Sequence, residues 1–524
     1  MNSQTLSRRD RGFLEARGIS AAAAEQQVRN LLSGTRFMHL DRPAVAGDGI
    51  HRLSDREARD LAAGYADRLA HIRVTKFVPA SGAASRMFAV PQAFLNGDLR
   101  VEERFLSGLE PRDSGPEAFL FHFFSGLRSG RFAFAGEVDD RLKSGGSSIG
   151  QAVENGEFRR ILSILLDPDH LGLADLPKAL IPFHVHGRRR RTPLEEHMAE
   201  ALEYGRGKGD VCKVHFTVSP DHLNAVRAKV NRVLPEFRSR VGAFHVEYSI
   251  QDPASDTLAV TPEGSLFRNR DGSPLLRPGG HGALIRNLDA LDADLVFIKN
   301  IDNVMPAGRV KESNYWKRVL GGFLLSQQER VFQLLRDLAE NHPGAADMAE
   351  RYLVETQGQA VPPEREGKDR ILWLSRRLNR PMRVCGMVVN RGEPGGGPYW
   401  VREPRGGASL QIVESAQINR DDPGQAEVLR QASHFNPVDL VCGLHDFQGN
   451  GFHLKEYVNP DTYFVAEKTR DGRPLLALEW PGLWNGAMHE WLTFLVEVPV
   501  TTFNPVKTVN DLLREEHQDG VSEA

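Results

Sequence analysis

Three segments of the sequence bring small, basic and acidic residues together in patterns that suit phosphate binding. The first is Ser81-Gly82-Ala83-Ala84-Ser85-Arg86, which lies between a short apolar run and a stretch predicted to be helical. Small residues at such a turn let backbone N–H groups approach a phosphate closely, and the helix N-terminus that follows adds a favourable dipole. Arg86 can contact phosphate oxygens with two nitrogens at once. A tight turn filled with small side chains is the alternative, and this stretch alone supports both equally.

The second and third segments supply a lysine and an aspartate. Lys178 precedes the apolar run 179–183 and so is expected at the rim of a sheet, with an ordinary solvated lysine as the alternative. The buried run 296–298 ends at Asn300 and Asp302. A lone aspartate at a strand end suits Mg²⁺ held against substrate phosphates. A turn residue that simply ends the strand is the alternative there.

The elements that could position these residues alternate between strand and helix. Apolar runs predict strands at 74–78, 211–218, 244–250 and 294–298. Amphipathic runs predict helices at 193–204 and 220–233. This alternation is typical of an α/β protein with a mixed, mostly parallel sheet covered by helices. Ligands bind at the carboxyl ends of strands in such sheets, which is where Asp302 and the turn at 81–86 fall.

The same patterns divide the chain into four parts. We expect an N-terminal helical extension at 1–72 and a nucleotide-binding α/β core at 73–309, with a helical insertion at 91–176. A second helical insertion is expected at 310–380, and 381–524 should complete the core, including the stretch around Lys507.

The composition excludes several classes of protein. The 524 residues carry 66 basic and 69 acidic side chains, and a net charge of −3 gives no general attraction to nucleic acid or an anionic membrane. Three dispersed cysteines form neither a disulfide framework nor a zinc motif. The N-terminus lacks the apolar stretch of a secretory signal, and no run reaches the roughly 18 apolar residues of a membrane span. We therefore expect a cytoplasmic protein with neither a nucleic-acid nor a membrane partner.

Seven short motifs resemble, in order, those of one enzyme superfamily. They lie at 79–87, 177–182, 278–282, 299–303, 410–417, 435–438 and 503–513. The first is similar to the Ala-Gly-x-Gly-Thr-Arg-Met loop of sugar nucleotidyltransferases, and the second to their Pro-Lys-x-Leu-x-Pro segment. The last is similar to the Phe-x-Pro-Val-Lys-x-x-x-Asp-Leu-Leu of the UDP-sugar pyrophosphorylase branch. The chain thus resembles this superfamily, with its nucleotide-diphospho-sugar transferase fold (Rossmann-like), and as a whole it also resembles a bacterial domain-of-unknown-function family.

The resemblance implies a reaction and a set of roles. An oxygen of a sugar 1-phosphate would attack the α-phosphorus of a nucleoside triphosphate, with UTP as the expected donor, and pyrophosphate would leave with help from Mg²⁺. The implied catalytic residues are Arg86, Lys178 and Lys507, and the implied metal ligand is Asp302. The implied nucleotide-binding residues are Ser81, Gly82, Ala83, Ala84, Ser85, Gln251, Gly280, His281 and Gly282. The implied sugar-binding residues are Asn300, Gly396 and Glu414.

Two other functions stay open at this stage. A glycosyltransferase could use the same sheet edge and Asp302 to hold a finished nucleotide-sugar. A non-catalytic nucleotide- or sugar-binding protein could keep the scaffold without the reaction. Ala84 favours the second, because it replaces a glycine of the superfamily loop and narrows the backbone freedom there. Lys178, Asp302 and Lys507 favour an enzyme.

A group of histidines lies outside these motifs. His184 and His186 are two residues apart, so on a strand both rings face the same side. With His197 they form a candidate metal set, although no spacing of a further ligand supports zinc. The neighbouring run of four arginines at 188–191 is expected to be a solvated loop.

Overall fold

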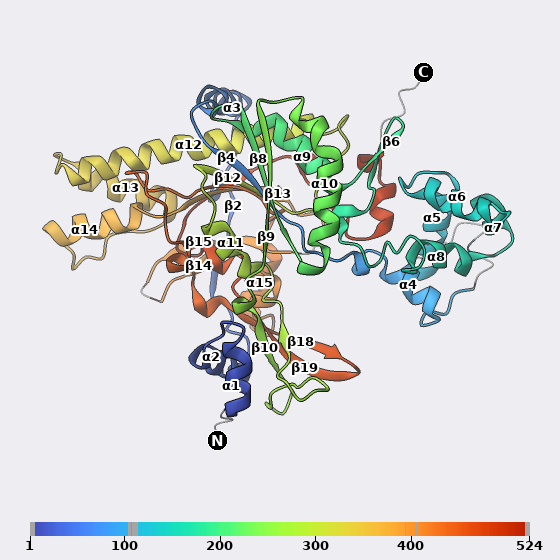
Figure 1. Cartoon of the computed structure of the whole chain (residues 1–524). Helices are drawn as coiled ribbons and strands as arrows, with labels where there is room; N and C mark the ends of the chain where they lie inside the picture. Colours follow the sequence, from blue (N-terminus) through green and yellow to red (C-terminus); the bar gives the residue numbers. More distant parts are fainter. Residues whose placement is uncertain (1–5, 103–105, 107–113, 394, 405, 519–524) are drawn as a thin grey trace. The chain divides into compact units, whose positions relative to one another are not determined.

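The computed structural model describes residues 6–102, 106, 114–393, 395–404 and 406–518 (Figure 1). The chain forms two compact units, each assembled from three separate stretches. Unit 1 comprises Met1–Phe77, Ser249–Ile298 and Arg318–Val500. Unit 2 comprises Val78–Tyr248, Lys299–Lys317 and Thr501–Ala524. A membrane span needs a long apolar helix, and the described residues contain no helix that meets this requirement.

Unit 1 is built on a mixed, mostly parallel sheet, which confirms the predicted α/β class. Its strands follow the order β2 (Val45–Ala46), β3 (Gly49–His51), β20 (Leu492–Glu497), β13 (Met382–Val389), β17 (Asp439–Gly443), β12 (Leu295–Lys299) and β4 (Val74–Pro79). β2, β3, β20 and β13 are parallel, as are β12 and β4, whereas β17 runs antiparallel to β13. The buried, apolar text of β12 and β4 is typical of strands covered on both faces.

β16 (His434–Phe435) pairs antiparallel with the end of β13, and unit 1 also contains two smaller antiparallel sheets. One has the order β1 (Leu40–Pro43), β14 (Gly397–Arg402), β15 (Ala408–Val413). The other has the order β11 (Leu276–Arg277), β10 (Thr257–Val260), β19 (Arg473–Glu479), β18 (Phe464–Arg470). β1, β2 and β3 lie in the segment 1–72, where the sequence predicted helices alone. Strands of two to four residues are too short to reveal an alternating pattern, and β1 and β3 pair with strands from distant parts of the chain.

The helices of unit 1 lie largely where the sequence predicts them. They are α1 (Arg8–Glu15), α2 (Ala21–Ser33), α3 (Asp55–Leu69), α11 (Ile285–Asp289), α13 (Ala345–Gln357), α14 (Gly367–Leu378) and α15 (Pro423–Gln431), with most of α12 (Lys311–Ala339). Ser54 and Glu57 form a capping box that starts α3. A Cβ at Gly322 of α12 would collide with the backbone carbonyl of Leu61, so this glycine lets α12 and α3 pack closely.

Unit 2 combines strands with many helices. β8 (Val211–Val218) has β7 (Arg206–Gly207) and β9 (Ala243–Ile250) as neighbours. β5 (His184–His186) and β6 (Arg189–Arg191) form a hairpin. The helices are α4 (Ala89–Asn96), α5 (Pro116–Arg128), α6 (Ala135–Ser144), α7 (Ile149–Glu154), α8 (Phe158–Leu166), α9 (Pro193–Tyr204) and α10 (Leu223–Arg238).

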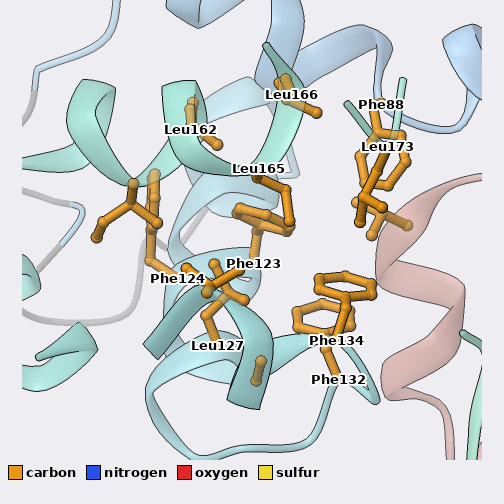
Figure 2. Close-up of a cluster of buried hydrophobic side chains, with 14 of the residues drawn as sticks. Phe88, Phe123, Phe124, Leu127, Phe132, Phe134, Leu162, Leu165, Leu166 and Leu173 are labelled. Atoms are coloured by element: carbon orange, nitrogen blue, oxygen red, sulfur yellow. The ribbon is translucent and has the colours of Figure 1, made fainter. Parts of the chain in front are cut away.

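One core of unit 2 is rich in phenylalanine and leucine (Figure 2). The rings of Phe132 and Phe134 stack with their centroids 5.0 Å apart. Val506, Val509 and Leu512 near the C-terminus belong to the same cluster as these rings. Burial of apolar side chains from both regions therefore holds the segment that carries Lys507 within unit 2.

Candidate phosphate-binding site

Two lysines meet one aspartate in unit 2. The Nζ atoms of Lys178 and Lys507 lie 3.0 and 2.9 Å from the same Oδ2 oxygen of Asp302. Exposed fractions differ sharply, at 11% for the side chain of Lys178, 9% for Asp302 and 59% for Lys507. Two ammonium groups and one carboxylate leave one excess positive charge at the site, which favours an anion.

The sequence around Asp302 explains how the three groups converge. β4 and β12 are parallel neighbours, so their carboxyl ends meet at one edge, and Asp302 follows β12. The backbone N–H of Val506 donates to the Asp302 carbonyl (3.0 Å), and the Val506 carbonyl accepts from Lys178 Nζ (2.9 Å). The C-terminal segment thereby fixes both Asp302 and Lys178.

Asp511 orients Lys507 from the same segment. The backbone N–H groups of Lys507 and Thr508 donate to its Oδ2, at 2.8 and 2.7 Å, as part of a capping box at the following 3-10 turn. Sequence reasoning did not select Asp511, although the Thr508-x-x-Asp511 spacing is the signal of such a box.

α9 fixes the turn before Asp302. Lys299 at the end of β12 forms a fully buried ion pair with Glu200 of α9, at 2.8 Å. His197 Nε2 lies 3.1 and 3.2 Å from the carbonyl oxygens of Asn300 and Ile301. His197 therefore supports the strand end, and it is not part of the metal set for which the sequence offered it as a candidate; Glu196 takes that place.

The charge state of Asp302 follows from its neighbours. Burial would raise the pKa of its carboxyl, but the charges and hydrogen bonds of Lys507 and Lys178 outweigh burial and hold the pKa below its usual value. Its second oxygen, Oδ1, is buried and has no hydrogen-bond partner among the described residues. A buried carboxylate oxygen without a partner is a free ligand position.

This oxygen decides whether Asp302 could hold Mg²⁺. Oδ1 offers one hard oxygen ligand, which Mg²⁺ prefers, but the two ammonium groups repel a bare cation. Among the described residues, Asp302 belongs to no cluster of three metal-ligating side chains. The residues therefore fit Mg²⁺ that arrives with phosphate oxygens, since those oxygens would supply the missing negative charge and ligands.

The turn at 81–86 lies against Lys178. Ala83 and Pro177 form a β-bridge, and the backbone N–H of Lys178 donates to the Gly82 carbonyl at 3.1 Å. Ser81, Gly82, Ala83, Ser85 and Arg86 are exposed. A Cβ at Gly82 would meet no atom within 4 Å, and Gly82 does not have a positive φ. Neither packing nor backbone geometry requires glycine here, which suits a position kept open for a ligand.

Ala84 differs from its neighbours in this turn. Its side chain is fully buried in the phenylalanine-rich core, and its backbone N–H donates to the Leu176 carbonyl at 3.1 Å. Ala84 thus packs the turn onto unit 2. The backbone N–H groups of Ser81, Gly82 and Ala83 donate to no atom in the described part of the chain, so they are the groups free for an anion.

The implied nucleotide-binding residues at 251 and 280–282 lie in unit 1. The glycines of the 280–282 loop pack closely: a Cβ at Gly282 would collide with the Pro481 carbonyl, and Gly280 has φ +71°. The His281 ring stacks on Trp484 with centroids 4.1 Å apart, and its Nδ1 accepts from the Leu483 N–H at 3.0 Å. Burial lowers the pKa of His281 to about 4, so the ring is neutral at neutral pH.

The remaining predicted residues are divided between the units. Gln251 of unit 1 contacts Asp256, with 3.4 Å between Nε2 and Oδ1. Glu414 of unit 1 accepts from Asn485 at 2.8 Å and lines a cavity of about 450 Å³ with a mixed polar and apolar wall. The Gly396 carbonyl accepts from the Asn436 N–H at 2.8 Å. Asn300, the third predicted sugar ligand, belongs to unit 2. Their roles stay predictions.

Fold and site define an α/β protein with a lysine–aspartate cluster and an exposed glycine turn at the carboxyl ends of paired parallel strands. The chain belongs to the family described as Domain of unknown function (DUF4301), whose pattern matches residues 7–518. No curated protein matches the chain.

Solved structures that resemble the chain include two sugar-nucleotide enzymes. One is the UDP-N-acetylglucosamine pyrophosphorylase of Trypanosoma brucei in complex with an inhibitor, with 13% identity and a TM-score of 0.48 over 97% of this chain and 79% of that one. Another is a mutant of the Leishmania major UDP-glucose pyrophosphorylase in complex with UDP-glucose, with 12% identity and a TM-score of 0.42 over 98% and 78%. Both TM-scores lie below 0.5, so the proposal that follows depends on the residues of the site itself.

Proposed function

We propose that the chain is a nucleotidyltransferase that joins a nucleoside triphosphate to a sugar 1-phosphate and releases pyrophosphate. The observation that carries the proposal is the cluster of Lys178, Lys507 and Asp302 beside the open turn at Gly82. Transfer of a nucleotidyl group between two phosphates needs positioning and neutralisation of charge more than it needs a nucleophile from the protein. The seven sequence motifs make UTP the expected donor.

The turn would bind the triphosphate. The exposed N–H groups of Ser81, Gly82 and Ala83 can donate to phosphate oxygens, as backbone N–H groups do in anion-binding turns. Arg86 is exposed and makes no ion pair with the described residues, so its guanidinium is free to contact two phosphate oxygens.

The lysines would neutralise the reacting phosphates. Lys507 is more than half exposed, so its ammonium can leave Asp302 for a phosphate oxygen with little loss of burial. Lys178 is buried and keeps its bond to the Val506 carbonyl, so it presents a fixed charge. Charge fixed in place before the reaction stabilises the transition state without reorganisation, which is the larger part of many catalytic effects.

Asp302 would hold the two ammonium groups in place before the substrate binds. Mg²⁺ would be held by its Oδ1 together with phosphate oxygens, where it would supply further neutralisation of phosphate charge. The cavity lined by Glu414 in unit 1 is a separate candidate for sugar hydroxyl groups, because it joins polar and apolar walls.

A screen for pyrophosphate release tests the proposal. Nucleoside triphosphates are combined with hexose 1-phosphates and Mg²⁺, and we expect one pair to release pyrophosphate and form the nucleotide-sugar. Lys208→Met, at an exposed lysine in unit 2, is the control and should match the wild type. Turnover of a finished nucleotide-sugar without pyrophosphate would instead identify a glycosyltransferase. Nucleotide binding without turnover of any pair would identify a binding protein.

A further inference from the structure

Unit 2 contains a cluster of three metal-ligating side chains apart from the lysine–aspartate site, formed by His184, His186 and Glu196. The Oε1 atom of Glu196 lies 3.0 Å from His184 Nδ1 and 2.8 Å from His186 Nε2. One ligand atom from each residue can be chosen so that all lie within 4.8 Å of one another. The side chains of His184 and Glu196 are buried, and that of His186 is 17% exposed.

Local structure fixes all three side chains. His184 and His186 alternate along β5, so both rings lie on one face of the hairpin, and β6 pairs with both residues through Arg191 and Arg189. Glu196 lies in the first turn of α9, which begins after a capping box at Thr192. A strand pair and a capped helix hold the three groups on rigid elements.

A third histidine supports the cluster from behind. His184 Nε2 lies 3.0 Å from Nδ1 of His517, which is buried near the C-terminus. The second ring nitrogen of a metal-ligating histidine usually bonds to an outer partner, most often a carboxylate, a carbonyl or water, which orients the ring and sets its tautomer; here the partner is a second imidazole. His184 has this arrangement, with Nδ1 turned to the cluster and Nε2 to His517.

We propose that His184, His186 and Glu196 bind a divalent transition-metal ion, with Zn²⁺ as the best match. Two imidazoles and one carboxylate are donors that Zn²⁺ accepts at about 2.0–2.2 Å. A tetrahedron of that size separates its ligand atoms by about 3.4 Å; the two distances from Glu196, 2.8 and 3.0 Å, are slightly shorter, and all three ligand atoms lie within 4.8 Å of one another. The partly exposed edge at His186 leaves a fourth position for water.

The charges around the cluster allow a cation. Arg191 lies 3.8 Å from the other Glu196 oxygen, but it also pairs with Glu236 at 3.4 Å. Its neighbour Arg189 pairs with Glu236 as well. Glu236 therefore neutralises part of the positive charge of the arginine run, and Oε1 of Glu196 stays available to a metal.

The bound ion would act on the C-terminal segment. A metal that fixes His184 also fixes its bond to His517, which lies ten residues after Lys507. We therefore expect Zn²⁺ to order residues 501–518 and to raise the stability of unit 2. This inference does not depend on the proposed reaction, because metal binding can be measured without turnover.

Equilibrium dialysis of the metal-stripped full-length protein against Zn²⁺ tests the site, with a Co²⁺ absorption spectrum to report the ligand geometry. We expect one ion per chain for the wild type, and loss of that ion in His186→Ala and Glu196→Gln. His186 is partly exposed, so its variant should fold, which circular dichroism checks. His170→Ala, at an exposed histidine of unit 2, is the matched control and should bind like the wild type.

Two further measurements separate a metal site from a hydrogen-bonded cluster. His517→Ala should keep the ion with roughly 10- to 100-fold weaker affinity, the usual effect of losing an outer partner. Zn²⁺ should slow hydrogen exchange in 501–518 of the wild type and leave it unchanged in His186→Ala. A wild type that retains no ion, or a His186→Ala variant that binds Zn²⁺ as tightly as the wild type, would overturn the proposal.

Discussion

Lys507 and Lys178 share one oxygen of Asp302, yet their different burial predicts that replacing them destabilises the protein to very different extents. Lys507→Met removes an ammonium whose side chain is 59% exposed, and Asp302 keeps its bond to Lys178. Ion pairs at such exposed positions contribute about 0–1 kcal/mol. Lys178→Met removes a buried donor from both Asp302 and the Val506 carbonyl. Loss of one partner from a buried pair costs about 3–5 kcal/mol, and we expect the lower end because Lys507 remains.

The loss of turnover in the two variants should not follow this difference in stability. If both ammonium groups stabilise charge in the transition state, each variant loses at least about 100-fold in turnover. Urea unfolding and pyrophosphate release, measured on the same preparations, give the two quantities. We expect the free energy of unfolding of Lys507→Met to lie within about 1 kcal/mol of the wild-type value. Lys178→Met should lower this free energy by about 3 kcal/mol, which changes the folding equilibrium constant by about two powers of ten.

Two results would contradict the reasoning. Equal destabilisation by both variants would contradict the difference in burial between the exposed Lys507 and the buried Lys178. A Lys507→Met variant with wild-type turnover would remove Lys507 from the reaction. Lys208→Met controls for the loss of a surface lysine charge, since its side chain is exposed in the same unit.

Three other predictions concern glycines and a histidine. Gly82→Ala should leave the free energy of unfolding unchanged or raise it by about 0.4–1 kcal/mol, because the added Cβ meets no other atom and the unfolded chain loses conformational freedom. Calorimetric titration should nonetheless detect weaker nucleotide binding. Unchanged binding would contradict the role of the turn in binding the triphosphate. Gly322→Ala should destabilise by about 1–3 kcal/mol in urea, because its Cβ meets the Leu61 carbonyl. The pKa of His281 falls from 6.5 to about 4 on folding, so the stability it supports is complete above pH 6.5 and is lost as pH falls toward 4, by about 3 kcal/mol. In His281→Asn the free energy of unfolding should no longer show this loss of about 3 kcal/mol between pH 6.5 and pH 4. A variant with the same pH dependence as the wild type would refute the burial of the His281 ring.

The sequence predicted the parts of the site that follow buried strands. The apolar runs of β4 and β12 were recognisable, and parallel pairing brings their carboxyl ends together, so the turn at 81–86 and Asp302 could be expected at one edge. The bond from Lys178 to the Val506 carbonyl joins residues 328 positions apart. Every residue has a backbone carbonyl, so the amino-acid sequence does not show which carbonyl accepts the bond, and this contact was not predictable.

The histidine cluster marks another limit of prediction from sequence. The pattern indicated that His184 and His186 share a face, which the hairpin confirms. It offered His197 as the third member where the structure has Glu196. Adjacent residues on an α-helix point about 100° apart, and only the packing of α9 decides which of them turns toward β5.

The division of each unit among three stretches has a consequence for synthesis of the chain. A ribosome makes residues in order, so Asp302 and Lys178 emerge long before Val506 and Lys507. Until residues 501–518 are added, the buried ammonium of Lys178 lacks its carbonyl partner and the core of unit 2 lacks Val506, Val509 and Leu512. We therefore expect unit 2 to reach its native state only after residues 501–518 have been synthesised, and fragments that stop before Thr501 to be incompletely packed.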